Sequence, residues 1–152
     1  MDAVTAHSAS LAPDFVARAS RILVIEDDDC VGRAIQAILD RRGHRTLLAS
    51  RASGGIQAFE SSTFDAVVVD LFMPGMNGLD TIAHIRRGSS IPIVAMSGFR
   101  LRNSLNDTDY LGMAMDRGAS ATIRKPFAGR ELIELIDRSL MAAYSQKKEL
   151  MQ

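Results

Sequence analysis

From Arg21 onward the chain alternates short apolar runs with amphipathic stretches, and this alternation constrains its fold more than any other feature. β-Branched runs separated by stretches of helical periodicity are typical of βαβ units, which build a parallel sheet. Three of the runs are apolar throughout, as expected for strands that helices cover on both faces. The sequence therefore predicts an α/β fold with five strands, at residues 22–25, 46–49, 66–69, 91–96 and 121–123.

The stretches between the strands predict helices. The first stretch has apolar residues at the spacing of one helix face, and Gly43 follows it as a terminator. Those apolar residues are Val31, Ala34, Ile35, Ile38 and Leu39. A polar loop is expected within the segment 98–117. Further helices are expected at about 53–61, 78–87, 110–115 and 129–144.

The composition fits one ordinary domain. Of the 152 residues, 47% are hydrophobic, which is enough for a single core without disulfides or a structural metal. Lys and Arg together number 18, as do Asp and Glu, so no net charge attracts nucleic acid. Cys30 is the single cysteine, and neither a leader peptide nor a run of 18 apolar residues is present. A cytoplasmic protein without membrane insertion is expected.

The chain is expected to divide into three parts. Residues 1–20 are predicted to be a flexible tail, residues 21–142 the folded domain, and residues 143–152 the end of the last helix or a tail. About a dozen residues follow the core of that helix, too few for a helix-turn-helix. The sequence therefore predicts a domain that acts without direct DNA binding.

Charged side chains follow the predicted strands at their carboxyl ends, where ligands bind in an open parallel sheet. Glu26 and Asp27 follow the first strand, and Asp70 follows the third. If these two strands are neighbours, three carboxylates share one crevice and require a cation. Oxygen ligands alone favour Mg²⁺ over zinc. Lys125 follows the fifth strand. Its ammonium group and a divalent cation together would balance the charge of the carboxylates, so that the site could accept a phosphoryl group.

Four motifs in these positions resemble the response-regulator receiver domain, over about residues 20–140. They are Ile-Leu-Val-Ile-Glu-Asp-Asp at 22–28, Asp-Ala-Val-Val-Val-Asp-Leu-Phe-Met-Pro-Gly-Met-Asn-Gly at 65–78, Ala-Met-Ser-Gly at 95–98 and Gly-Ala-Ser-Ala-Thr-Ile-Arg-Lys-Pro-Phe at 118–127. The resemblance implies a doubly wound, flavodoxin-like (CheY-like) fold with sheet order 2-1-3-4-5 and a cis bond between Lys125 and Pro126. It also implies a single-domain response regulator of a two-component or phosphorelay system, without an output domain.

The resemblance implies a role for each residue of the expected site. Asp70 matches the phosphoacceptor, Lys125 the phosphate-binding lysine and Ser97 the switch hydroxyl. The implied ligands of Mg²⁺ are Glu26, Asp27, Asp70 and the backbone carbonyl of Phe72. The implied partners are a histidine kinase or histidine phosphotransfer protein as donor and a downstream protein as target. A homodimer through the face of the fourth helix, fifth strand and fifth helix is also implied.

Three features depart from the pattern of the family. Thr122 stands where the family has a switch aromatic, so the output is expected to be read through the segment 98–117 instead. That segment is longer than is common, and its residues 100–106 are expected to contribute to partner binding. Phe72 and Phe99 occupy the positions that flank the path of the hydrolytic water, which predicts a long-lived phosphoryl group.

Two alternatives remain open. Asp27-Asp28-Asp29-Cys30-Val31 fits the D-x-D-x-[TV] motif of haloacid dehalogenase-like phosphatases, in which Asp27 is the nucleophile. That alternative leaves Asp70 unexplained, and the sequence lacks the later acidic pair of those enzymes. The second alternative is a receiver-like binding module that works without phosphorylation. The favoured interpretation is a domain that is no enzyme beyond its own phosphorylation and dephosphorylation.

Overall fold

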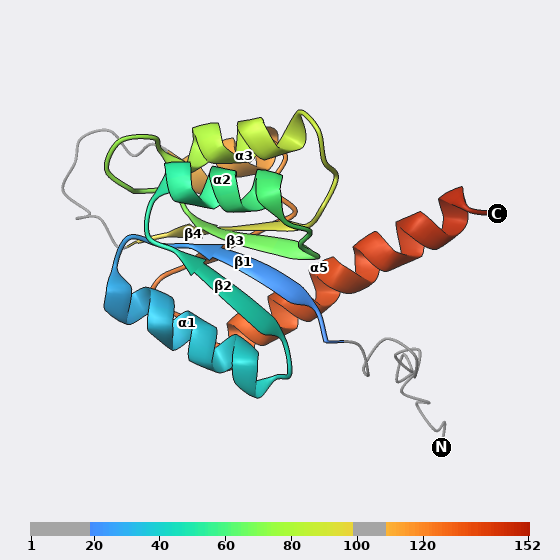
Figure 1. Cartoon of the computed structure of the whole chain (residues 1–152), viewed down its shortest axis with the longest axis horizontal. Helices are drawn as coiled ribbons and strands as arrows, with labels where there is room; N and C mark the ends of the chain where they lie inside the picture. Colours follow the sequence, from blue (N-terminus) through green and yellow to red (C-terminus); the bar gives the residue numbers. More distant parts are fainter. Residues whose placement is uncertain (1–18, 99–108) are drawn as a thin grey trace, which may run out of the picture.

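The structure is a computed structural model that describes residues 19–98 and 109–152. It contains a five-stranded parallel sheet in the order β2-β1-β3-β4-β5, with a helix after each strand (Figure 1). The strands are β1 (Arg21–Ile25), β2 (Arg45–Ala49), β3 (Ala66–Asp70), β4 (Ile93–Ser97) and β5 (Ala121–Arg124). The predicted fold class and strand order are confirmed.

Some predictions fall on parts of the chain outside the described residues. They concern the tail up to residue 18, Phe99, and the polar segment 100–106. Within the described ranges, no helix is both long enough and apolar enough to cross a membrane.

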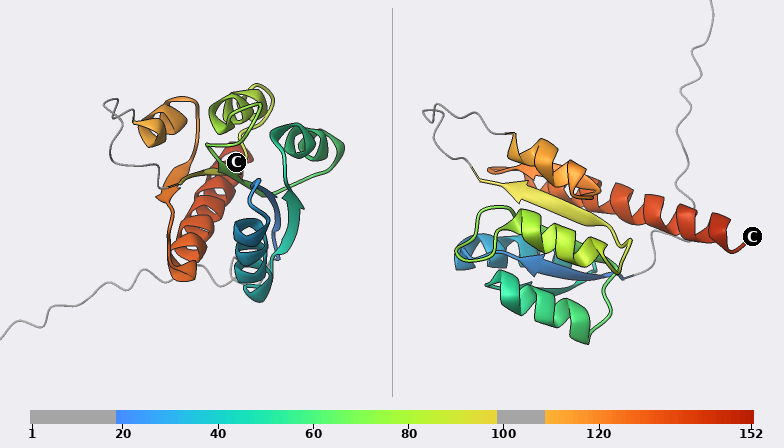
Figure 2. Two further views of the ribbon diagram at one scale, coloured as in Figure 1. Left: turned by 90° about the vertical axis from the view of Figure 1, so that its left-hand side faces the viewer. Right: turned by 90° about the horizontal axis from the view of Figure 1, so that it is seen from above.

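Helices cover the sheet on both faces (Figure 2). They are α1 (Asp29–Arg41), α2 (Ala52–Ser61), α3 (Gly78–Arg86), α4 (Tyr110–Asp116) and α5 (Gly129–Leu150). Helices α1 and α5 pack on one face, and α2, α3 and α4 pack on the other. All of β3 is buried, with Val67 and Val69 in one core and Val68 in the other. Burial on both faces is why the central strands are apolar throughout.

Strand β4 begins two residues later than the sequence predicted. The apolar run starts at Ile91, but the strand starts at Ile93. Pro92 has no backbone N–H to donate to a neighbouring strand, so regular pairing begins after it.

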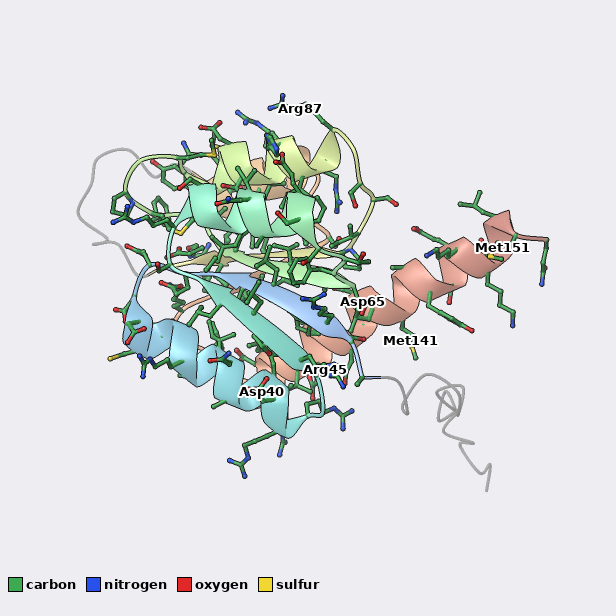
Figure 3. The ribbon with its side chains drawn as sticks, viewed as in Figure 1. Asp40, Arg45, Asp65, Arg87, Met141 and Met151 are labelled. Carbon is green, nitrogen blue, oxygen red and sulfur yellow. The ribbon has the colours of Figure 1, made fainter. Side chains whose placement is uncertain are left out.

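Helix α5 is longer than predicted and projects beyond the sheet. Its 22 residues span about 33 Å, whereas a five-residue strand spans about 17 Å. The buried residues of α5 end at Leu140, and Met151 lies near the end of its projecting part (Figure 3). Apolar periodicity predicted a helix only to about Tyr144, because the apolar pattern stops where α5 no longer packs against the sheet. The helix continues because no glycine or proline follows until the chain ends.

The register of the sheet places the ends of β1 and β3 side by side. Ile25 pairs with Val69 in the parallel ladder between these strands. Glu26, the next residue after β1, therefore lies beside Asp70, the last residue of β3. The carboxyl edge of the sheet is thus where the predicted site residues meet.

Candidate functional site

Three carboxylates converge at the carboxyl edge of the sheet. Glu26, Asp27 and Asp70 each place one oxygen within 4.8 Å of the others. Glu26 and Asp70 are buried, with 1% and 4% of their surface exposed, whereas Asp27 is exposed. Buried carboxylates this close repel each other unless a positive charge lies beside them.

Backbone amides hold the two buried carboxylates in place. The N–H of Asp28 donates to Glu26 Oε1 over 3.2 Å, and the N–H of Phe72 donates to Asp70 Oδ1 over 3.1 Å. Asp28 is also the N-cap of α1, because its side chain accepts from the N–H of Val31. The start of α1 and the loop after β3 therefore orient the acidic groups.

The ammonium group of Lys125 contacts both buried carboxylates. Its Nζ lies 2.6 Å from Glu26 Oε2 and 3.2 Å from Asp70 Oδ2. The N–H of Lys125 donates to the carbonyl of Ser97, which joins the loop after β5 to the end of β4. The bond between Lys125 and Pro126 is cis, as the resemblance implied. The structure thus brings Lys125 together with the three carboxylates, while the roles of these residues stay predictions.

Burial changes the protonation of this cluster. Burial raises the pKa of Glu26 to about 7, although the hydrogen bond from Lys125 acts in the opposite direction. Burial by itself would lower the pKa of Lys125, but the hydrogen bond to Glu26 and the charges of Asp70 and Glu26 raise it above its ordinary value. Lys125 is therefore charged at neutral pH, and Glu26 is near its protonation midpoint.

The donor set fits a hard divalent cation. The candidate ligands are carboxylate oxygens, which Mg²⁺ prefers over the nitrogen and sulfur ligands typical of zinc. Three carboxylates and one ammonium leave a net charge of about −2 when all are ionised, which matches one Mg²⁺. The exposed side chain of Asp27 marks the side of the cluster that is open to solvent. The backbone carbonyl of Phe72 stays a predicted ligand.

The two predicted switch residues lie on β4 and β5. Ser97 ends β4 and is half-buried, and its hydroxyl donates to the carbonyl of Gly98 over 3.5 Å. Among the described residues, no hydrogen bond joins this hydroxyl to the acidic cluster. Thr122 is half-buried on β5, paired with Ala95 of β4. The carbonyl of Ser97 thus accepts from Lys125, whereas no hydrogen bond among the described residues joins the Ser97 hydroxyl to the carboxylates.

Gly78 supports the position of Asp70, and nothing in the sequence marked this role. Its N–H donates to the carbonyl of Leu71 over 3.1 Å, at the start of α3. A Cβ atom on Gly78 would collide with the carbonyl oxygen of Asp70 and with the Cα of Leu71. These are backbone atoms, which cannot rotate away as a flexible side chain can. Only a residue without a side chain lets α3 approach the end of β3 so closely.

We expect Gly78→Ala to destabilise the fold by about 1–3 kcal/mol, because the added methyl group overpacks the backbone beside Asp70. Urea unfolding measures this change as a lower transition midpoint. Gly54→Ala is the matched control, because its Cβ meets nothing within 4 Å and lies in the exposed part of α2. The control should leave stability unchanged or raise it by up to about 1 kcal/mol. Equal stability of the two variants would contradict the packing role.

Two aromatic rings meet beside the cluster, again without a signal in the sequence. The ring centroids of Phe72 and Tyr110 lie 4.7 Å apart with an interplanar angle of 82°. Phe72 belongs to the loop after β3, and Tyr110 is the first residue of α4. No spacing rule relates residues this far apart in the chain, so only the fold reveals the contact.

A groove of about 750 Å³ lies at the opposite edge of the sheet, between α5 and the turns that precede β4 and β5. Among the residues that the structure describes, its lining includes Arg86 and Arg138 and no Asp or Glu. Arg86 donates to the carbonyls of Gly118, Ser89 and Ile91, so it joins the turns of this edge. The groove is separate from the acidic cluster.

Comparisons with known proteins agree on one family. The sequence profile described as "Response regulator receiver domain" matches residues 22–137. The uncharacterized transcriptional regulatory protein YrkP of Bacillus subtilis is 34% identical over 133 residues, which cover 86% of this chain and 54% of that protein. The DNA-binding response regulator MtrA of Mycolicibacterium smegmatis is 28% identical, over 86% of this chain and 55% of that protein. A receiver domain structure from Clostridium thermocellum has a TM-score of 0.72 at 25% identity, with coverage of 88% and 99%.

These relatives correct one prediction. The chain spans about half the length of the curated relatives it matches. One relative is named a DNA-binding response regulator and another a transcriptional regulatory protein, which contradicts the prediction of a domain without direct DNA binding. The prediction depended on how few residues follow the last helix, whereas the relatives are about twice as long as the matched region. Absence of a helix-turn-helix in this sequence was therefore no ground for excluding DNA.

Proposed function

This chain belongs to the response regulator receiver domain family, and on that premise we propose that Asp70 accepts a phosphoryl group from a phosphohistidine. The donor is a histidine kinase or a histidine phosphotransfer protein. One observation carries the proposal: the buried carboxylate of Asp70 lies 3.2 Å from the ammonium of Lys125 within a cluster of three carboxylates. A carboxylate nucleophile, a fixed cation and a metal-binding acidic pair are the groups that phosphoryl transfer requires.

The reaction exchanges one bond to phosphorus for another. An oxygen of Asp70 forms the new O–P bond while the P–N bond to the donor imidazole breaks, and the imidazole nitrogen keeps the electron pair. The ammonium group of Lys125 shifts from the carboxylates to the phosphoryl oxygens. The N–H of Phe72 continues to donate to the oxygen of Asp70 that does not react. Ser97 then donates its hydroxyl hydrogen to a phosphoryl oxygen. Mg²⁺ held by Glu26, Asp27 and Asp70 supplies charge neutralisation of those oxygens when bound.

The direct test is phosphorylation by a small donor. The chain is incubated with acetyl phosphate and Mg²⁺, its intact mass is measured, and the modified residue is mapped. The expected result is one added phosphoryl group, on Asp70. Modification of Asp27 with turnover of a phosphomonoester would instead support the haloacid dehalogenase-like alternative. No modification at all would support a binding module that works without phosphorylation.

We also propose that the phosphorylated domain controls transcription within a longer DNA-binding regulator, as the names of the relatives suggest. A single-domain regulator that acts through protein contacts is the second candidate, because the receiver domain from Clostridium thermocellum is matched over 99% of its chain. An antibody to the chain distinguishes them in source cells. A band near 16.5 kDa favours the single domain, and a clearly heavier band with phosphorylation-dependent DNA binding favours the longer regulator. A cytoplasmic location is part of the proposal.

The affinity for Mg²⁺ is expected to fall about tenfold between pH 8 and pH 6. The pKa of Glu26 is about 7, so lowering the pH adds a proton to a carboxylate that has to be ionised to bind the ion. Isothermal titration of the chain with MgCl₂ at several pH values measures this change. The control is Glu26→Gln, which should bind more weakly at every pH and lose most of the pH dependence. A wild-type affinity that is constant over this range would contradict the role of Glu26.

Phe72→Asn is expected to shorten the lifetime of the phosphoryl group several-fold. A polar side chain two residues beyond Asp70 admits and orients the hydrolytic water that the phenyl ring excludes. The decay of the phosphorylated mass after removal of acetyl phosphate measures the lifetime. Phe59→Asn is the control, because Phe59 is also half-buried against the same core but lies on α2. Equal lifetimes of Phe72→Asn and the wild type would remove this explanation.

A further inference from the structure

The contact between Phe72 and Tyr110 joins the phosphoacceptor loop to α4. The rings pack edge to face, with centroids 4.7 Å apart, a geometry in which the positive edge of one ring meets the negative face of the other. Tyr110 is 39% exposed, so it lies on the surface over the half-buried ring of Phe72. The first residue of α4 therefore contacts the second residue after Asp70.

Phe72 is itself tied to the reacting group. Its N–H donates to Oδ1 of Asp70 over 3.1 Å, on the other side of the carboxylate from Lys125, which contacts Oδ2. Esterification changes the charge and the geometry of this carboxylate. Any resulting shift of the backbone at Phe72 moves the ring that Tyr110 contacts.

Strand β5 offers no aromatic side chain that could serve this purpose. Its residues are Ala121, Thr122, Ile123 and Arg124. On the same face of the sheet, Leu111 and Met113 of α4 pack against the core that contains Ala95, the partner of Thr122 in the ladder. Within the described residues, Tyr110 is thus the aromatic group that α4 presents to the loop of the phosphoacceptor.

We propose that Tyr110 is a positioning residue, which holds the ring of Phe72 beside Asp70, prolongs the life of the aspartyl phosphate and transmits the state of Asp70 to the start of α4. This inference rests on the proposed phosphorylation of Asp70. It places the link between the site and α4 at Tyr110, within the segment 98–117 through which the output is expected to be read.

The first experiment measures the lifetime of the aspartyl phosphate in Tyr110→Ala, Tyr110→Phe and the wild type. Loss of the aromatic contact should shorten the half-life between about twofold and tenfold, and Tyr110→Phe should restore it because the ring is kept. Met115→Ala is the matched control, since Met115 is 47% exposed on the same helix. The rate of phosphorylation by acetyl phosphate should be the same in all four proteins. A wild-type half-life in Tyr110→Ala would overturn the proposal.

The second experiment tests transmission directly, with a readout that a purely structural contact would not move. The chain has no tryptophan and two tyrosines, so Tyr144→Phe leaves Tyr110 as the single intrinsic fluorophore. Beryllofluoride with Mg²⁺, which mimics the phosphoryl group, should change its emission, and Phe72→Leu should abolish most of that change. If acetyl phosphate modifies the protein but the emission of Tyr110 does not change, this inference is overturned and the proposed function is not. A wild-type chain that takes up no phosphoryl group overturns the proposed function and, with it, this inference.

Discussion

Asp70→Asn is expected to abolish the uptake of a phosphoryl group from acetyl phosphate. The amide is a far weaker nucleophile than the carboxylate, and the change also removes one of the three negative charges that attract the metal ion. Intact mass measured after incubation with acetyl phosphate and Mg²⁺ should show the unmodified chain alone. The fold should persist, because the amide oxygen can still accept from the N–H of Phe72.

The control for this experiment lies in the same acidic run. Asp28→Asn removes one negative charge next to the cluster but keeps the helix cap, since Asn caps as well as Asp. It should be phosphorylated normally. Asp27→Asn should be phosphorylated more slowly, at a higher Mg²⁺ requirement. If Asp70→Asn were phosphorylated and Asp27→Asn were not, Asp27 would be identified as the nucleophile and the proposed function would be refuted.

Lys125→Gln is expected to change two measurements in opposite directions. Phosphorylation should slow by about 10²–10³-fold, because the ammonium no longer stabilises the charge that develops on the phosphoryl oxygens. Mg²⁺ should bind more tightly, because the carboxylates lose the cation that lies 2.6 Å from Glu26. Opposite effects exclude simple unfolding, which would weaken both.

Arg124→Gln is the matched control for this variant. It removes one positive charge from the neighbouring residue, which is exposed at the end of β5. Both the rate and the Mg²⁺ affinity should stay close to those of the wild type. If Arg124→Gln behaved like Lys125→Gln, the effect would come from the overall charge of the domain rather than from contact with Glu26 and Asp70.

Much of the fold could be predicted because burial on both faces leaves a strong sequence signal. The apolar runs that became β1 and β3 needed no information beyond their own residues. The acidic cluster followed from the same reasoning, because parallel strands place Glu26 and Asp70 at one edge of the sheet. The order of the strands came from the resemblance to the family, since periodicity does not say which strands are neighbours.

The rest of the site depends on contacts between distant segments. Gly78 was expected only to begin a helix, and its close approach to the backbone of Asp70 is visible only in three dimensions. The pairing of Phe72 with Tyr110 joins the loop after β3 to the start of α4, and the relative position of these two segments depends on the whole sheet. The end of α5 was misjudged for a different reason. Its last turns contact little of the domain, and an exposed helix has no apolar stripe to mark it.

The direction of α5 has a practical consequence for measurements on this domain. Strand β1 starts at Arg21, and α5 runs back to the same edge of the sheet. The start of β1 and the end of α5 therefore both lie at the edge away from Asp70 (Figure 1). A biotin or fluorescent label at Gln152, at the tip of the projecting helix, therefore stands clear of any protein that docks over the acidic edge. Immobilisation through this tip should leave the acidic edge accessible, which makes it the preferred attachment point for binding kinetics on a sensor surface.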